Sequence, residues 1–281
     1  MGGIGKLTFH EKLGAAWQRA DSLLCIGLDP DPARIALDDI AAFNIAIIEA
    51  TADLVCAYKP NVAFYEALGP ERGYAILRRT LAVIPADVIT LADAKRGDVG
   101  HTAEAYARAL FDDLGFDAAT VNPYLGGDSM QPWTRRAEKG AFVVCRTSNP
   151  GAVDLQDMRV EGDGSTRPLY EVVAERARGW DEHANVGLVT GATYPAEMAR
   201  LRELCPGMPF LVPGIGAQQG DLAAAVRAGL DADGRGLLVS ASRGVTYASK
   251  GADFAEAARA EAARLRDEIN AERAATAARN R

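Results

Sequence analysis

The sequence predicts an α/β protein in which one (β/α)8 barrel, a TIM barrel, accounts for all 281 residues as a single domain. Three observations support this fold class. Short apolar runs rich in β-branched residues alternate along the chain with longer amphipathic segments. The runs are apolar at nearly every position, which is typical of parallel strands buried on both faces. Eight such pairs are present, which is the number that closes a (β/α)8 barrel.

Each predicted strand is one of these apolar runs, and each is followed by a segment with helical spacing. The predicted strands cover residues 23–29, 54–60, 88–95, 118–123, 141–148, 186–192, 209–216 and 236–242. The predicted helical segments cover residues 38–53, 64–84, 101–115, 129–140, 169–184, 194–206, 220–231 and 253–274.

Two segments depart from this alternation. Residues 151–168 form a long polar insertion without a clear period, which we expect to be either a mobile surface loop or a lid over an active site. Residues 271–281 are expected to form a helical tail that frays at its end. A doubly wound sheet is the alternative fold. It is disfavoured because no glycine-rich fingerprint follows a predicted strand, and the glycines within residues 2–6 precede the first one.

The charge balance argues against nucleic acid as a partner. Lys and Arg total 31 and Asp and Glu total 38, so the formal net charge is −7. A small anionic ligand is still compatible with this balance, because one Arg and a few backbone N–H groups can hold a phosphate. No apolar run approaches the roughly 20 residues that span a bilayer, and the N-terminus lacks the apolar region of a signal peptide. We therefore expect a cytoplasmic protein without a membrane partner.

Cysteine and histidine spacing predicts no metal and no cofactor held by these residues. The four cysteines form no CxxC pair, and three of them lie in strand-like runs, where they are expected to be small core residues. The three histidines show no ligand spacing. His101 follows the third predicted strand and is expected to begin a helix rather than to bind a metal.

The most informative polar cluster is at the end of the third predicted strand. Functional groups of a (β/α)8 barrel gather at the carboxyl ends of its strands. Asp93 and Lys95 are two residues apart, so they point to the same face of a strand, and Asp98 follows the strand. Lys59 ends the second strand and adds a second cation. Such charges are costly on a buried strand for stability alone, which favours a catalytic set over an ion-pair network that caps the strand end.

The flanking strand ends add further polar groups. Asp29 ends the first strand, and Asn61 follows Lys59. A lysine at a strand end is also a candidate for a Schiff base, but that chemistry requires a neutral amine. The neighbouring carboxylates of Asp93 and Asp98 favour the ammonium, so Lys95 is interpreted as an acid rather than a nucleophile.

A second cluster predicts a phosphate site. Residues 213–218 form the glycine-rich sequence PGIGAQ after the seventh strand, and Ser242 and Arg243 follow the eighth. The loops after these two strands commonly bind phosphate in such barrels. Glycine lets the backbone approach the anion, and an arginine can bind it bidentately.

Taken in order, these motifs resemble the orotidine 5′-phosphate decarboxylase family, and the likeness spans nearly the whole chain. The matching segments are Gly27-Leu28-Asp29, Lys59-Pro60-Asn61, the run DAKRGDVGHT at residues 93–102, Thr147-Ser148-Asn149-Pro150-Gly151, PGIGAQ at residues 213–218, and Ser242-Arg243. The length, the Ser-Asn-Pro-Gly segment and the insertion after it resemble the longer bacterial subfamily, type 2.

The resemblance implies a metal- and cofactor-independent decarboxylation of orotidine 5′-monophosphate to UMP and CO2, the last step of de novo UMP synthesis. It implies that Lys95 protonates C6 of the pyrimidine and that Asp93 lies beside the substrate carboxylate. It also implies a homodimer whose active sites are shared across the subunit interface. The remaining implied roles are ribose contacts for Asp29 and Lys59, partner-supplied groups for Asp98 and Thr102, a pyrimidine hydrogen bond for Ser148, phosphate contacts for Gln218 and Arg243, and pocket-lining or substrate-binding positions for Asn61, Pro213 and Ser242. Ser242 departs from the glycine that the family often has there, but its backbone N–H still suits a phosphate.

Two alternatives stay open at this point. A sugar-phosphate decarboxylase or aldolase of the same superfamily shares a similar Asp-x-Lys-x-x-Asp strand but uses Mg2+. Thr102 and the segment after Ser148 argue against it. A non-catalytic phosphate-binding barrel is the second alternative, and it leaves the charged set of Lys59, Asp93, Lys95 and Asp98 without a purpose.

Overall fold

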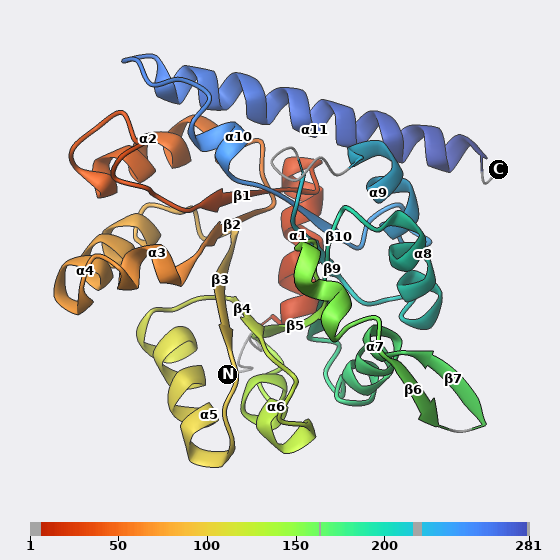
Figure 1. Cartoon of the computed structure of the whole chain (residues 1–281). Coiled ribbons are helices and arrows are strands. Elements are labelled where there is room, and N and C mark those ends of the chain that lie inside the picture. The colour runs from red at the N-terminus through yellow and green to blue at the C-terminus, as the bar shows by residue number, and fades with distance from the viewer. Residues whose placement is uncertain (1–6, 163, 216–220, 280–281) are drawn as a thin grey trace, which may run out of the picture.

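A computed structural model describes residues 7–162, 164–215 and 221–279 and contains a closed barrel of eight parallel strands (Figure 1). The strands are β1 (Leu24–Leu28), β2 (Ala57–Pro60), β3 (Ile89–Arg96), β4 (Ala118–Val121), β5 (Gly140–Arg146), β8 (Val186–Thr190), β9 (Phe210–Val212) and β10 (Leu237–Ala241). The order around the barrel is β1-β10-β9-β8-β5-β4-β3-β2. The predicted (β/α)8 fold is therefore confirmed, and every barrel strand lies within, or within one residue of, a predicted apolar run.

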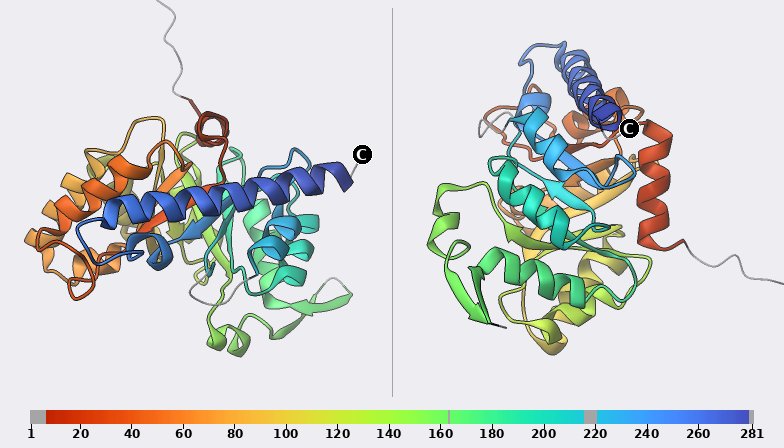
Figure 2. Two further views of the ribbon diagram at one scale, coloured as in Figure 1. Left: turned by 90° about the horizontal axis from the view of Figure 1, so that it is seen from above. Right: turned by 90° about the vertical axis from the view of Figure 1, so that its right-hand side faces the viewer.

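Helices surround the barrel and follow its strands in the expected alternation (Figures 1 and 2). They are α1 (Phe9–Ala20), α2 (Ile40–Thr51), α3 (Val62–Glu66), α4 (Pro70–Leu81), α5 (Gly100–Arg108), the π-helix η1 (Ala109–Asp113), α6 (Gly127–Thr134), α7 (Leu169–Gly179), α8 (Pro195–Leu204), α9 (Leu222–Gly229), α10 (Arg243–Thr246) and α11 (Phe254–Arg279). The segment expected as one helix over residues 64–84 is divided into α3 and α4. Gly69 has a φ of +89° there, and Pro70 begins the second helix.

Helix α1 precedes the first strand and closes the amino end of the barrel, which the sequence pattern did not predict. Thr8 and Glu11 form a capping box at its start. The Phe9 ring packs edge-on against Phe142 of β5, and the Trp17 indole N–H donates to the carbonyl of Leu237, where β10 begins. These contacts leave the opposite, carboxyl end of the barrel open for a site.

The insertion is folded rather than structureless. After a short 3-10 helix, η2 (Pro150–Asp154), the strands β6 (Arg159–Gly162) and β7 (Ser165–Pro168) form an antiparallel hairpin that projects outward (Figure 1). Gly164 has a φ of +75°, which suits a tight turn. The sequence showed no sign of this hairpin because four-residue strands are too short to show a clear alternation.

The C-terminal helix α11 is continuous through Arg279, so the tail expected to fray is helical as far as the structure describes it. It packs against α2 and α9 and carries ion pairs from Arg259 to Asp53 and from Glu272 to Arg227 (Figure 1). Among the residues with described positions, no helix is long and apolar enough to cross a membrane.

Candidate active site

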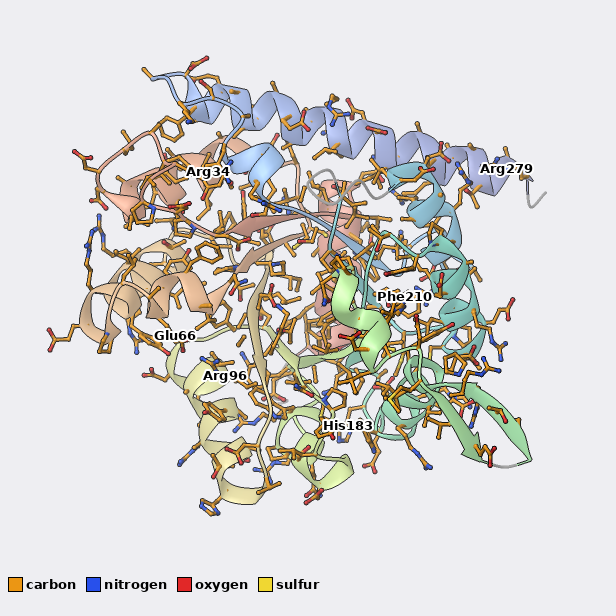
Figure 3. All side chains as sticks on the ribbon, viewed as in Figure 1. Arg34, Glu66, Arg96, His183, Phe210 and Arg279 are labelled. Atoms are coloured by element: carbon orange, nitrogen blue, oxygen red, sulfur yellow. The ribbon has the colours of Figure 1, made fainter. Side chains whose placement is uncertain are left out.

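The carboxyl end of β3 is irregular, and this irregularity presents the central charged residues. Ala92 pairs with Ala119 of β4, whereas Arg96 pairs with Val121, so the chain of β3 bulges between them. Within the bulge Lys95 has a φ of +48°, a left-handed conformation that non-glycine residues seldom adopt. Arg96 turns away and pairs with Glu66 of α3 (Figure 3).

Asp93 is the centre of the site, because two lysines reach its two carboxylate oxygens. Lys59 Nζ lies 2.8 Å from Oδ2, and Lys95 Nζ lies 2.5 Å from Oδ1. The side chains of Lys59 and Asp93 are 5% and 11% exposed, while that of Lys95 is 49% exposed. Lys59 and Asp93 therefore form a buried pair, and Lys95 extends from it toward solvent.

The charge states of this pair follow from opposing effects. Burial tends to raise the pKa of Asp93, but the ammonium groups of Lys59 and Lys95 outweigh it and hold that pKa well below its ordinary value. Burial tends to lower the pKa of Lys59, but the carboxylates of Asp93 and Asp29 outweigh it and raise that pKa. Both groups are thus ionised at neutral pH.

Asp29 is held from both sides at the end of β1. Its Oδ1 accepts from the backbone N–H of Asn61 at 3.2 Å, and its Oδ2 accepts from the Ser242 hydroxyl at 2.7 Å. Gly27 permits this close approach, because a Cβ there would lie 2.7 Å from the Cβ of Ser242. Asn61 also forms a bridge with Asp93, which connects the ends of β2 and β3.

These residues surround a cavity of about 240 Å³ at the carboxyl end of the barrel. Most of its lining consists of residues that the sequence singled out. The lining residues are Asp29, Lys59, Asn61, Asp93, Ser148, Pro213, Gly214, Ile215, Ser240, Ser242 and Arg243. A cavity that combines carboxylates at one side with an arginine beside a glycine loop suits a ligand with a cationic or hydroxyl-bearing part and an anionic part.

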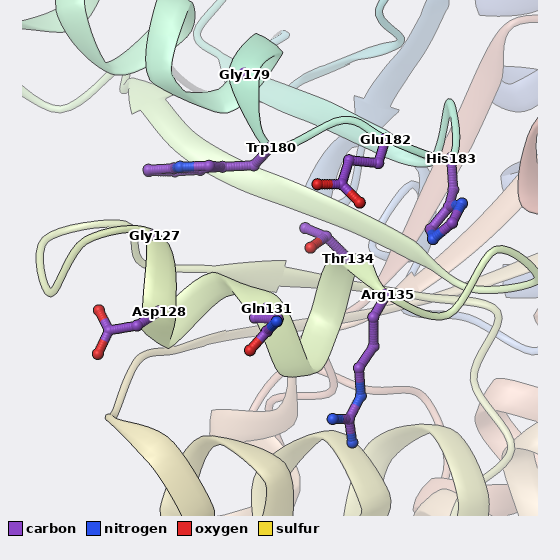
Figure 4. Close-up of a pocket in the computed structure, with 9 residues that line it drawn as sticks. All are labelled: Gly127, Asp128, Gln131, Thr134, Arg135, Gly179, Trp180, Glu182 and His183. Carbon is purple, nitrogen blue, oxygen red and sulfur yellow. The ribbon is translucent and has the colours of Figure 1, made fainter.

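A larger cavity, of about 360 Å³, lies elsewhere, between α6 and the end of α7 (Figure 4). It is lined by Gln131, Arg135, Trp180 and His183 among others, and none of the predicted site residues reaches it. Size alone would favour this cavity. We favour the smaller one because it contains the buried ion pair and lies at the strand ends where barrel chemistry gathers.

Four predicted residues are not among those that line the cavity in the described part of the chain. Lys95 is one of them, although its Nζ lies beside the cavity, bonded to the Asp93 carboxylate. Asp98 accepts a hydrogen bond from the backbone N–H of Val99 at 2.8 Å, and Thr102 lies in the first turn of α5. Neither lines the cavity. Gln218 lies outside the described residues.

Two groups that support the site were not predicted from the sequence. The first is Thr120 of β4, whose hydroxyl contacts Asp93 at 3.1 Å. The second is the pair of Arg146 and Gln156. Arg146 is 1% exposed and stacks 3.8 Å from the ring centroid of Tyr194, while Gln156 bonds both the backbone and the hydroxyl of Thr147. This contact ties the insertion to the strand end that bears Ser148.

The described residues also contain little that suits a metal ion. Over residues 7–162, 164–215 and 221–279, no group of three or more His, Cys, Asp or Glu side chains is placed to hold one. The four cysteines are buried and free, which confirms the core position expected for Cys25, Cys56 and Cys145. Burial raises the pKa of Cys205 to about 11, so this thiol is protonated at neutral pH.

Comparisons with known proteins converge on one family. The family model for orotidine 5′-phosphate decarboxylase / HUMPS matches residues 22–260. An orotidine 5′-phosphate decarboxylase of Roseiflexus sp. (strain RS-1) is 53% identical over 272 residues, which cover 94% of this chain and 98% of that protein. The structure of Leishmania donovani OMP decarboxylase superposes with a TM-score of 0.84 and 46% identity, over 95% of this chain and 99% of that one. The Leishmania donovani UMP synthase gives 0.85 and 47%, over 95% of this chain and 57% of that one.

Proposed function

The chain belongs to the orotidine 5′-phosphate decarboxylase / HUMPS family, and from this premise we propose that it is an enzyme converting orotidine 5′-monophosphate to UMP and CO2. The observation that carries the proposal is the Asp93 carboxylate bonded by both Lys59 and Lys95 beside a cavity that also contains Asp29 and Arg243. The sequence likeness to enzymes named for this activity supports the choice of substrate.

The chemical step needs a group that stabilises and then protonates a carbanion. Breaking the bond between C6 and the carboxylate leaves the electron pair on C6 as CO2 departs. Lys95, as an ammonium, stabilises that charge while it develops and then donates a proton, so that an N–H bond breaks and the C6–H bond of UMP forms. Lys95 recovers its proton from solvent, to which its half-exposed side chain has access.

Asp93 contributes by repelling the substrate carboxylate. The position of Asp93 in the lining of the cavity supports this role. Two unit charges about 4 Å apart at an effective dielectric of about 20 interact by roughly 4 kcal/mol. Enzymes generally lower barriers by roughly 8–23 kcal/mol, so repulsion supplies only part of the effect. Stabilisation of the carbanion by Lys95 supplies a further part.

Remote groups bind the rest of the substrate. Arg243 and the backbone N–H of Ser242 hold the phosphate together with Gln218, and Pro213 lines the pocket. Asp29 and Lys59 contact the ribose, with Asn61 beside them, and Ser148 donates to the pyrimidine. The energy of phosphate binding offsets the cost of placing the substrate carboxylate near Asp93.

We further propose that the enzyme is a homodimer in which each subunit lends Asp98 and Thr102 to the other site. Both residues follow β3 yet stay outside the cavity of their own chain. Large apolar side chains are exposed on the loops after β3, β4 and β5, which supports an interface there. They are Val99, Tyr124, Leu125, Val153, Leu155 and Met158.

The competing function is a Mg2+-dependent reaction on a sugar phosphate, because the Asp-x-Lys-x-x-Asp pattern of residues 93–98 is shared with enzymes of that kind. We expect purified protein to convert orotidine 5′-monophosphate to UMP in the presence of EDTA. The absorbance of the orotate ring should then decrease with time. Turnover that appears only after Mg2+ is added, or no turnover at all, would sink the assignment.

A further inference from the structure

Thr120 is the only residue of β4 opposite the bulge of β3. Between the paired positions Ala92–Ala119 and Arg96–Val121, residues 93–95 of β3 face this one residue. The Thr120 side chain is fully buried, with 0% exposure. An interruption of the ladder leaves backbone N–H groups without their regular strand partners, and buried N–H groups need substitutes.

The Thr120 hydroxyl replaces those partners. Its oxygen accepts from the backbone N–H of Ala94 at 3.0 Å and from that of Lys95 at 2.9 Å. The same hydroxyl donates to Oδ1 of Asp93 at 3.1 Å. A hydroxyl has one hydrogen and two lone pairs, so these three bonds use its full capacity.

The three bonds define the geometry of both reacting groups. Lys95 has its left-handed φ of +48° within this bulge, and such a conformation persists only where the surroundings hold it. The Asp93 oxygen that receives the Thr120 hydroxyl is the same Oδ1 that receives Lys95 Nζ. One side chain on the neighbouring strand thus contacts the backbone of the lysine and the carboxylate that orients its ammonium.

We propose that Thr120 is a positioning residue for the decarboxylation, which aims the Lys95 ammonium by holding the bulge backbone and the Asp93 carboxylate together. This proposal rests on the proposed function for its catalytic meaning. Thr120 is fully buried and its hydroxyl already makes three hydrogen bonds, so it acts through Asp93 and Lys95 rather than on the substrate.

The test compares Thr120→Val, which keeps the branched shape but removes the hydroxyl, with Thr120→Ser, which keeps the hydroxyl. A misplacement of about 1 Å costs on the order of 10²-fold in rate, so kcat of Thr120→Val should fall by about that factor with KM nearly unchanged. Thr120→Ser should stay within about threefold of the unaltered enzyme. If Thr120→Val does not fold, Thr120→Ala takes its place in the comparison with Thr120→Ser.

The matched control is Thr80→Val, in α4. Thr80 is also fully buried, and its hydroxyl accepts from the side-chain amide of Asn44 at 3.1 Å. This variant should lose stability but keep kcat. The proposal is overturned if Thr120→Val keeps kcat within about threefold, if only KM changes, or if Thr120→Ser loses as much activity as Thr120→Val.

A crystal structure of Thr120→Val, or of Thr120→Ala, gives a readout independent of turnover. We expect the φ of Lys95 to become negative and its Nζ to leave Asp93. An unchanged bulge would overturn the positioning role. If the unaltered protein does not decarboxylate orotidine 5′-monophosphate, the proposed function fails on that result, while these structures still decide whether Thr120 holds the bulge.

Discussion

Replacing Lys59 by methionine measures how much stability the fold loses when the buried Asp93 carboxylate loses one of its cations. The substitution keeps a long, unbranched side chain but leaves Asp93, 11% exposed, without one of its two cations. Removing one partner of a buried pair costs about 3–5 kcal/mol. Lys95 still lies 2.5 Å from Asp93, so we expect the lower end, about 3 kcal/mol. For a domain of this size that cost corresponds to a decrease in Tm of roughly 6–12 °C.

Thermal unfolding followed by circular dichroism at pH 7 measures this decrease. Lys12→Met is the control, because Lys12 pairs with Asp117 at 3.2 Å while both side chains are more than a fifth exposed. Such a pair contributes about 0–1 kcal/mol, so the control should change Tm by no more than about 4 °C. A Lys59→Met variant that is as stable as Lys12→Met would refute the argument that removing one cation from the buried Asp93 carboxylate destabilises the fold.

The pH dependence has a definite sign. The lowered pKa of Asp93 stabilises the fold above the ordinary aspartate pKa of about 3.9, and this contribution is lost as the pH falls through the folded value. The raised pKa of Lys59 stabilises the fold below about 10.4, and this contribution is lost as the pH rises through the folded value. The difference in Tm between unaltered protein and Lys59→Met should therefore be constant from about pH 5 to 9 and narrow below about pH 4.

Two further predictions concern the neighbourhood of the cavity and the subunit interface. Gly191→Ala would place a Cβ 2.7 Å from the backbone nitrogen of Ser148, so KM for orotidine 5′-monophosphate should rise on the order of tenfold. Gly207→Ala is the control and should leave KM unchanged, because a Cβ there would meet open space. Equal KM values for the two variants would contradict the proposed hydrogen bond from Ser148 to the pyrimidine. Lys95→Ala and Asp98→Ala subunits should each be inactive alone, but an equal mixture should recover about a quarter of full activity, since half the dimers have one intact site of two. Absence of recovery would contradict a shared site.

The barrel was predictable because its signal is repeated. Seven of the barrel strands are buried at nearly every position, and β3 is mostly buried up to Ala92, so each appears in the sequence as an apolar run. The eight runs occur in the order expected for a (β/α)8 barrel. Helix α1 was missed because it stands outside that repeat and its role, closing the amino end of the barrel through Phe9 and Trp17, depends on contacts with distant strands. The hairpin of β6 and β7 was missed because its strands are short and largely exposed.

The charged residues of the site were predictable, but the geometry between them was not. Strand alternation places Asp93 and Lys95 on one face, and the structure does bond them, yet it does so through a bulge rather than a regular strand. Thr120 was missed because a threonine within an apolar strand is ordinary in sequence and becomes informative only opposite that bulge. Asp98 and Thr102 lie away from the cavity of their own chain. In the proposed homodimer they complete the site of the other subunit, and the sequence of one chain does not reveal such an arrangement.

The proposed role of Lys95 as donor of the proton that completes decarboxylation is tested most directly by comparing two rates. They are the rates of UMP formation by the unaltered protein and by Lys95→Ala, both in the presence of EDTA. We expect turnover by the unaltered protein, and a rate at least about 10²-fold lower for the variant, with UMP still bound at similar affinity. A variant that forms UMP at the unaltered rate would contradict it.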